Sequence, residues 1–526
     1  MVSALQKKRL EYKPSIPQLL KDLKKVGFYP ASSKKAPHEN LKKLFPHTFS
    51  SAPHQLKEAH HPHSKPLKVG FVFSGGQAAG GHNVAAALFD ALHSFDPKSE
   101  LIGFLGGPSG IIDNEWRRIE SKELSLYRNQ GGFDLVGSGR TKIQTEGQLA
   151  SALKTVCHHK LDGLVIIGGD DSNTNAAILA EYFLDKGCPT RVIGVPKTID
   201  GDLQTEDIEI SFGFDSACKT YAELIGNIAR DALSAKKYYH FIKLMGRSAS
   251  HIALECALAT QPNLTLIGEE RKGIDQIVSE IADLIANRFK AGKEYGVVLV
   301  PEGLIEFIPE VKEIIQELNR ILAKDGSTEP QNGLSEKLKK RFESFPEKIR
   351  KQLLLDRDPH GNVQVSQIET EVLLMDLVKK ELKKRGDYKG KFKAQEHFLG
   401  YEGRSCMPTN FDANYCYALG TIAALAIRDN LTGMIASVQH LARPAGEWRC
   451  KMAPIVQMMD FEMRSGKEKP VIQKALVDLS GKPFNRFAKM RKSWEIEDHY
   501  QYPGPIQFFG DPALTASAPL ILRGVL

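Results

Sequence analysis

Three short segments combine glycines, carboxylates and a lysine in a pattern that suits work on phosphate groups. They read SGGQAAGGHN (74–83), GGDDS (168–172) and PKTIDGD (196–202), and each follows an apolar run of strand length. Glycines at a turn that leads from a strand into a helix let backbone N–H groups approach an anion closely, and the start of the helix adds positive potential. The first segment therefore predicts a phosphate-binding loop.

The acids and the lysine of the other two segments indicate phosphoryl transfer. Asp170 and Asp171 follow the run LVIIGG, and Lys197 and Asp200 follow RVIGVP. A carboxylate at the carboxyl end of a parallel strand lies where open α/β sheets bind ligands, and it can hold Mg²⁺ on a phosphate. Phosphoryl transfer is catalysed mainly by positioning and by neutralising charge, which these residue types can provide.

Two simpler interpretations remain open at this stage. A glycine-rich turn also suits a dinucleotide cofactor, although neither the G-x-G-x-x-G spacing nor the Gly-Lys-Ser/Thr of a P-loop is present. In the second segment, Asp171 or Ser172 could cap a helix that begins near Asn173. That role would leave Asp170 unexplained.

Composition indicates a globular protein of more than one lobe. The chain has 526 residues, of which 42% are apolar and 25% charged, and this length exceeds what one hydrophobic core usually spans. The net charge of +8 is a modest excess, and no basic stripe with interleaved aromatic residues is present, so we expect no nucleic-acid partner.

The seven cysteines and the N-terminal sequence favour a cytoplasmic location. No C-x-x-C pair occurs, which argues against a zinc ribbon and a disulfide framework. The N-terminal residues lack an apolar signal core, and no run of about 18 apolar residues appears anywhere. We therefore expect neither secretion nor a membrane partner.

The elements that must position these residues alternate between strands and helices. Short Val- and Ile-rich runs predict strands at Leu67–Phe73, Leu164–Ile167, Arg191–Val195, His240–Leu244, Tyr295–Val300 and Met434–Gln439. Longer amphipathic stretches predict helices at Asn83–Leu92, Gln148–Cys157, Asn173–Leu184 and Phe214–Ala235. This alternation is typical of an α/β fold with mainly parallel sheets flanked by helices.

Changes in composition predict the boundaries of the lobes. An extension rich in Lys, Pro, Ser and His comes first and has no sustained strand or helix pattern apart from Ile16–Val26, and a highly charged helical insertion interrupts the second half. The predicted parts are the extension (1–66), a first lobe that binds the phosphate donor (67–235), a second lobe that binds the acceptor (236–304 and 399–526) and the insertion (305–398).

Further along the chain stand MGRSASH (245–251), PEG (301–303) and GYEGR (400–404). Together with the first three segments, and in this order, they resemble the motifs of the phosphofructokinases from about Leu67 to the C-terminus. Within that family the chain is similar to the long, pyrophosphate-dependent type, such as the β chain of the plant enzyme. The resemblance implies two Rossmann-like lobes and a helical insertion.

The resemblance implies a role for each residue of the donor side. Gly76 and Arg140 would bind pyrophosphate, and Asp170 would coordinate the Mg²⁺ that bridges it. Asp200 would take the proton from the sugar 1-hydroxyl, and the nearby Lys197 would favour its ionised form.

Asp171 and Lys197 would select the donor, because the ATP-using relatives usually carry glycine at both positions. The Asp171 carboxylate would occupy the space and copy the charge of the α-phosphate of ATP, so that nucleotide is excluded. Lys197 would offset charge on the transferring group, so both residues count as catalytic.

The acceptor side is implied in the same way. The residues that match sugar-phosphate positions are Thr198, Ile199, Asp200, Lys237, Tyr238, Met245, Gly246, Arg247, Glu302, Tyr401, Glu402, Gly403 and Arg404. Among these, Lys237 and Tyr238 match positions that reach into the site of the neighbouring subunit. The resemblance therefore implies a homodimer with shared sites.

The activity implied by the resemblance is reversible transfer of a phosphoryl group from pyrophosphate to the 1-hydroxyl of fructose 6-phosphate, in glycolysis or gluconeogenesis. One alternative is an ATP-dependent enzyme of the same fold, which Asp171 and Lys197 oppose. Another is a regulatory subunit like the plant α chain, which the intact GGDDS and PKTIDGD oppose.

Overall fold

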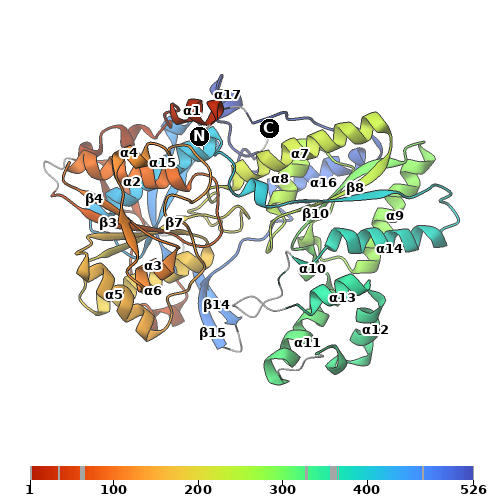
Figure 1. The fold of residues 1–526 in the computed structure, drawn as a ribbon, viewed down its shortest axis with the longest axis horizontal. Coiled ribbons are helices and arrows are strands. Elements are labelled where there is room, and N and C mark those ends of the chain that lie inside the picture. Colours follow the sequence, from red (N-terminus) through yellow and green to blue (C-terminus); the bar gives the residue numbers. More distant parts are fainter. Residues whose placement is uncertain are drawn as a thin grey trace.

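The computed structural model describes residues 3–32, 36–59, 65–325, 330–355, 364, 367–464, 467–506 and 508–524. They form two lobes that lie side by side, each with its own sheet (Figure 1). The fold class is α/β, as the alternation of strands and helices predicts. Within this described part, no helix is long and apolar enough to span a membrane.

The first lobe is built on a nine-stranded sheet in the order β1-β2-β13-β12-β7-β6-β3-β4-β5. The five strands from β12 to β4 run parallel to one another. The strands are β1 (Val26–Pro30), β2 (His54–Glu58), β3 (Lys68–Phe73), β4 (Glu100–Phe104), β5 (Trp116–Arg118), β6 (Gly163–Gly168), β7 (Arg191–Pro196), β12 (Met434–Gln439) and β13 (Arg449–Pro454).

Helices cover both faces of this sheet, which explains why its central strands are continuous apolar runs. All six residues of β6 are buried. The helices α2 (Gly81–Phe95) and α15 (Asn410–Arg428) lie on one face, and α3 (Pro108–Ile112), α5 (Glu146–His158) and α6 (Asp170–Asp185) lie on the other (Figure 1). Contact between α2 and α15 is close, because a Cβ at Gly420 would lie 2.4 Å from the Val84 carbonyl oxygen.

The second lobe contains a four-stranded parallel sheet in the order β11-β8-β10-β9. Its strands are β8 (Tyr238–Leu244), β9 (Leu264–Thr265), β10 (Tyr295–Pro301) and β11 (Ala394–Leu399). One face packs into the core that includes α7 (Phe214–Ala235), α8 (His251–Thr260) and α16 (Lys482–Ile496). The other face packs against α9 (Ile274–Lys290) and the helices of the insertion.

The insertion is helical over most of its length, and its apolar side chains join the core of the second sheet. Its helices are α10 (Leu304–Phe307), α11 (Pro309–Asp325), α12 (Glu336–Ser344), α13 (Glu347–Leu353) and α14 (Thr370–Lys384). The predicted end at residue 398 is wrong in one respect, because β11 pairs with β8 and belongs to the second sheet. The sequence AQEHFL has no apolar run that would have revealed this edge strand.

The prediction that residues 399–526 belong to the second lobe is also wrong for the part of this range that precedes α16. Helix α15 and strands β12 and β13 return to the first lobe, where β12 pairs with β7 through Met434 and Ile193. The chain then forms the hairpin of β14 (Met459–Arg464) and β15 (Lys467–Ile472) and crosses to the second lobe at α16. Strands join a sheet through a free neighbouring edge, which chain order does not reveal.

The segment 1–66, predicted to lack regular strands, contributes two of them to the first sheet. Strand β1 pairs with β2, and β2 pairs with β13 at the edge of the sheet. The helix α1 (Ala4–Leu10) docks through Arg9, whose guanidinium donates to the Pro408 carbonyl oxygen at 2.7 Å. Short strands with several polar residues, such as HQLKE, carry too weak a pattern to be recognised.

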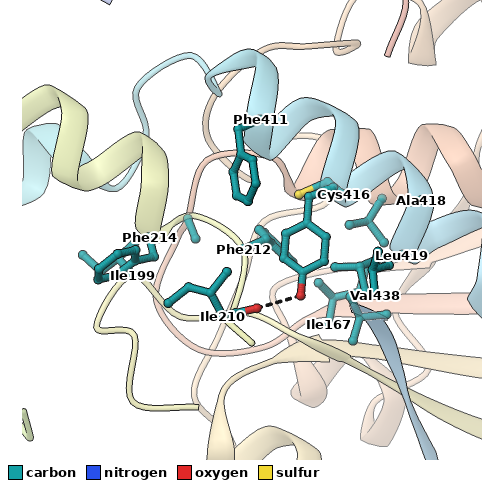
Figure 2. Packing of buried hydrophobic residues seen from close by; sticks show 14 of the residues in the cluster. Ile167, Ile199, Ile210, Phe212, Phe214, Phe411, Cys416, Ala418, Leu419 and Val438 are labelled. Carbon is teal, nitrogen blue, oxygen red and sulfur yellow. Dashed lines mark hydrogen bonds between the residues drawn. The ribbon is translucent and has the colours of Figure 1, made fainter. Parts of the chain in front are cut away.

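The predicted strands and helices are confirmed, with ends that differ by a few residues. The loop between β7 and α7, which carries the third predicted segment, rests on the core of the first lobe. Figure 2 shows Phe411 and Cys416 of α15 near Phe212 and Ile210 of this loop. The Tyr415 hydroxyl donates to the Ile210 carbonyl oxygen at 2.7 Å, so the loop is held by packing and by a buried hydrogen bond.

Candidate active site

The three predicted segments meet in one cleft. Strands β3, β6 and β7 are neighbours in the first sheet, so the loops after their carboxyl ends lie together. Gly76, Asp170, Lys197 and Asp200 all line the cleft, and Arg247 lines it from the second lobe. The position agrees with the general rule that open α/β sheets bind ligands beyond the carboxyl ends of their strands.

Three cations surround the first glycine-rich loop. Lys197 Nζ donates to the Gly76 carbonyl oxygen at 2.7 Å. A Cβ added to Gly76 would lie 3.4 Å from the Arg404 guanidinium and 3.5 Å from Arg140 Nη2. The chain enters α2 through Gly80 at φ 110, a conformation that favours glycine. The loop, the helix start and the cations together form a site for an anion.

Lys197 is buried among these groups, with 5% of its surface exposed, and lines the cleft. Burial of its ammonium, helped by the positive charge of Arg404, lowers its pKa to about 8. Asp200 acts in the opposite direction, because a nearby carboxylate favours the charged lysine. A bound phosphate would add to that effect and keep Lys197 protonated.

The adjacent carboxylates Asp170 and Asp171 occupy the first turn of α6, for which Gly169 is the N-cap residue. The helix therefore begins three residues before Asn173, and the capping role considered for Asp171 is wrong. Asp170 Oδ2 is buried and has no hydrogen-bond partner among the described residues. A buried carboxylate oxygen without a donor is a candidate ligand for a cation.

The two residues after Asp170 hold the site together in different ways. Asp171 Oδ1 lies 3.1 Å from Lys142 Nζ, which comes from the loop before α5. The Ser172 hydroxyl, predicted as a possible cap, instead donates to Ser74 Oγ at 2.8 Å and ties α6 to the end of β3.

The third segment contributes two carboxylates with different environments. The Asp200 N–H donates to Thr198 Oγ1 at 3.1 Å, so the turn that presents Asp200 is partly fixed by its own side chain. Asp202 is buried, and burial together with the charges of Asp200 and Asp170 raises its pKa to about 7. Asp200 and Asp202 both line the cleft.

The second lobe places part of its predicted set beside the cleft. Arg247 lines it directly, while Gly246 and Glu302 lie behind, where Glu302 Oε2 accepts the Gly246 N–H at 2.9 Å. Burial raises the pKa of Glu302. Met245, which precedes them at the end of β8, is 3% exposed.

The GYEGR segment forms a short turn in which only the last residue lines the cleft. The Arg404 guanidinium lies 5.3 Å from the centre of the Tyr401 ring, and Tyr401 is 66% exposed. Glu402 accepts the N–H of Gly400 at 3.0 Å and so shapes the turn. A Cβ at Gly403 would lie 2.5 Å from the Tyr221 ring, which explains the glycine there.

Lys237 and Tyr238 do not join the other predicted residues. They stand at the junction of α7 and β8 and are exposed, and neither lines the cleft of their own chain. Tyr238 has φ 64, so the backbone turns sharply at this point.

Sequence reasoning missed two lysines that line the cleft, Lys142 and Lys474. Lys142 stands two residues after Arg140, so its place in the same loop was a usable signal. Lys474, in VIQKAL, has no glycine or acidic neighbour to mark it.

In the part of the chain that the structure describes, the cleft offers single carboxylates rather than a complete set of metal ligands. Among the described residues, no group of three or more His, Cys, Asp or Glu side chains could hold an ion. One carboxylate such as Asp170 instead fits Mg²⁺, which usually keeps several waters and binds through one or two carboxylates plus substrate phosphates.

The fold and this cleft define a sugar-phosphate kinase of the α/β class. The phosphofructokinase family model matches residues 68–427, and the chain belongs to this family. It is 49% identical to the pyrophosphate–fructose 6-phosphate 1-phosphotransferase of Treponema pallidum, over 99% of this chain and 97% of that one. It is also 49% identical to subunit beta 1 of the enzyme of that name in Arabidopsis thaliana, over 99% and 94%.

Solved structures show the same fold at lower identity. The pyrophosphate-dependent phosphofructokinase of Nitrosospira multiformis superposes with a TM-score of 0.56 at 16% identity, and covers 86% of this chain and 97% of that one.

Proposed function

We propose that this protein is a pyrophosphate-dependent phosphofructokinase. It transfers a phosphoryl group from pyrophosphate to the 1-hydroxyl of D-fructose 6-phosphate and releases fructose 1,6-bisphosphate and phosphate. The observation that carries the choice of donor is the Asp171 carboxylate, which lines the phosphate cleft beside the start of α6. A nucleotide would have to place its α-phosphate against this charge, whereas pyrophosphate has no such group.

On the donor side, the residues around Gly76 bind and neutralise pyrophosphate. Lys197, Arg140 and Arg404 converge on this loop, and their charges stabilise the negative charge that spreads over the transferring group. Because the three cations repel one another, an anion that binds between them relieves an unfavourable interaction.

On the acceptor side, Asp200 acts as the general base. Its carboxylate takes the proton of the 1-hydroxyl, the oxygen bonds to the terminal phosphorus of pyrophosphate, and the bond to the leaving phosphate breaks. Asp202, whose pKa is raised to about 7, supports the turn. The sugar phosphate is bound from the cleft walls by Thr198, Ile199, Arg247 and Arg404. The rest of the acceptor site is formed by Met245, Gly246, Glu302, Tyr401, Glu402 and Gly403.

Mg²⁺ is part of the proposal. Asp170 would hold it through the carboxylate oxygen that has no other partner among the described residues. A Mg²⁺ ion held there would supply positive charge that offsets the negative charge of the phosphates and of the leaving group.

A homodimer with shared sites is also proposed. Lys237 and Tyr238 are exposed and lie outside the cleft of their own chain, so they are available to a second copy. Substituting both with alanine should raise the KM for fructose 6-phosphate, and light scattering should give the mass of two chains. We further propose a cytoplasmic location, supported by seven cysteines of which none forms a disulfide in the described residues.

The decisive experiment is a coupled assay of the purified protein with fructose 6-phosphate and Mg²⁺, in which pyrophosphate and ATP are offered separately. Turnover is expected with pyrophosphate, in both directions, because the phosphoanhydride and the product ester differ little in free energy. Turnover only with ATP, or in one direction only, would contradict the proposal.

A further inference from the structure

A segment that crosses between the lobes runs along the cleft. Residues 472–477, called the strap here, begin at the last residue of strand β15 and lead toward α16. Two hydrogen bonds tie it to the first lobe: the Ile472 N–H donates to Thr174 Oγ1 at 3.2 Å, and the Ala475 N–H donates to the Asp202 carbonyl oxygen at 2.7 Å. Two others tie it to the second lobe: His251 Nε2–H donates to the Ala475 carbonyl oxygen at 3.0 Å, and the Val477 N–H donates to Glu269 Oε1 at 2.9 Å.

The strap delivers one side chain to the cleft, that of Lys474. Its Nζ donates to Ser248 Oγ at 2.7 Å and lies 4.0 Å from Asp170 Oδ2. The side chain is 34% exposed, so a ligand in the cleft can reach it. Since its neighbours in the strap are fixed on both sides, the position of this ammonium is determined by the fold.

Lys474 and Lys197 approach the carboxylates of the site from different directions. Lys197 lies against the glycine-rich loop, with Arg404 and Arg140 as its charged neighbours. The charged neighbours of Lys474 include Asp202 and Arg247. Asp170 and Asp200 are charged neighbours of both lysines, and all four side chains line the cleft.

We infer that Lys474 is a further catalytic residue, which contacts the phosphoryl group during its transfer; this inference rests on the proposed function. The group that moves is anionic and must pass close to Asp170 and Asp200, both of which repel it. A fixed ammonium beside these carboxylates lowers that repulsion where the charge develops. Lys474 lies outside residues 68–427, where the family model matches.

The same position gives Lys474 a second, measurable effect. Its ammonium forms an ion pair with Asp170 Oδ2 at 4.0 Å, and this buried carboxylate oxygen has no hydrogen-bond donor among the described residues. A divalent cation that binds Asp170 must work against this positive charge. Removing the charge should therefore favour binding of the metal while it slows transfer.

The test compares Lys474→Met, Lys474→Gln and Lys474→Arg with a matched control in the strap. Gln473→Ala is that control, because the Gln473 amide donates to Asp460 Oδ2, on β14, and does not line the cleft. We expect both neutral variants to lower kcat by about 100-fold with KM values for both substrates within about threefold. Lys474→Arg should retain at least about a tenth of kcat, and Gln473→Ala should resemble the wild type.

Binding of Mn²⁺, followed by electron paramagnetic resonance of the free ion, separates this role from structural damage. The neutral variants should bind Mn²⁺ as tightly as the wild type or more tightly, whereas a collapsed site would bind it more weakly. The inference is overturned if the kcat of the neutral variants stays within threefold of the wild type, or if Gln473→Ala lowers kcat as much as they do. It is also overturned if the neutral variants bind Mn²⁺ more weakly than the wild type. Circular dichroism and thermal melting select the neutral variant that remains folded.

The experiment also separates this inference from the proposed function. If the wild type uses ATP and not pyrophosphate, the proposed donor is wrong. The kcat values of the variants and of the wild type are then measured with ATP as the donor. A loss of kcat with whichever donor the wild type uses supports the role of Lys474. Equal kcat with that donor rejects it.

Discussion

Lys142 Nζ and Asp171 Oδ1 lie 3.1 Å apart at the edge of the phosphate cleft. Both side chains are partly exposed, 26% and 36%, so the pair alone adds little to stability. The loop that carries Lys142 is fixed to α6, since Ile143 N–H donates to Asn175 Oδ1 at 2.8 Å. The pair therefore holds the Asp171 carboxylate in one place, where its charge can act on a donor.

Replacing Asp171 and Lys197 together by glycine should shift the donor preference toward ATP. The change removes the charge and bulk that exclude an α-phosphate and the cation that serves pyrophosphate. We expect the ratio of kcat/KM for ATP to that for pyrophosphate to rise at least about tenfold, or about 1.4 kcal/mol. Asp185→Ala, at the far end of α6, is the control, and an unchanged ratio would reject exclusion by Asp171.

Removing the partner of Asp171 should weaken pyrophosphate binding. In Lys142→Met the Asp171 charge is no longer offset and repels the donor, so we expect its KM to rise about threefold to tenfold with little change in kcat. Adding Asp171→Gly should reverse most of this rise, which a double-mutant cycle measures. Lys154→Met, on the exposed face of α5, serves as the control; additive effects would contradict the coupling.

Asp200→Asn should lower kcat by a factor of about 10² to 10⁴, because an amide cannot take the proton of the acceptor hydroxyl. The loss should appear in both directions of the reaction, since the same group returns the proton. Steady-state kinetics with pyrophosphate and with phosphate measure it. A loss as large in Asp202→Asn alone would indicate that the base has been assigned to the wrong carboxylate.

Pyrophosphate use should decline as the pH rises through about 8. Burial and the neighbouring Arg404 lower the pKa of Lys197 to about 8 in the free protein, so its ammonium loses the proton above this pH and attraction for the donor falls. The profile of kcat/KM for pyrophosphate should show this descending limb. Lys197→Arg, which stays protonated, should remove the limb; a limb that persists would assign the titration to another group.

Stability should depend on pH through Glu255, which lies outside the cleft. Burial raises its pKa to about 7, although the N–H groups of Leu520 and Ile521 donate to it and act in the other direction. Between pH 4.5 and 7 the folded state keeps a proton that the unfolded chain has lost, so this group's contribution to stability falls as the pH rises.

The measurement is urea unfolding of the wild type and Glu255→Gln at pH 5 and pH 8. The difference in unfolding free energy between the two proteins should change by about 2 to 3 kcal/mol, with the wild type relatively weaker at the higher pH. Glu336→Gln, at an exposed position on α12, should change nothing. A constant difference between the proteins would show that Glu255 does not titrate in this range.

Much of the fold was predictable from local patterns. The strands β3, β6 and β7 are buried on both faces, so they appear as unbroken apolar runs, and α7 begins and ends at the predicted residues. The edge strands β1 and β11, and the neighbouring strand β2, were missed because partly exposed strands mix polar and apolar residues.

The sequence by itself determined the chemical residue types of the site and the family of the chain, because glycines, acids and a lysine directly after apolar runs form contiguous motifs. Only the tertiary structure decided which lobe α15 and β12 join. It also decided that Lys142 and Lys474 lie beside Asp171 and Asp170, the carboxylates of the second motif. Lys474 and Asp170 are brought together by a strap that is anchored to both lobes. Such a contact depends on how distant segments pack, and spacing along the chain carries no record of it.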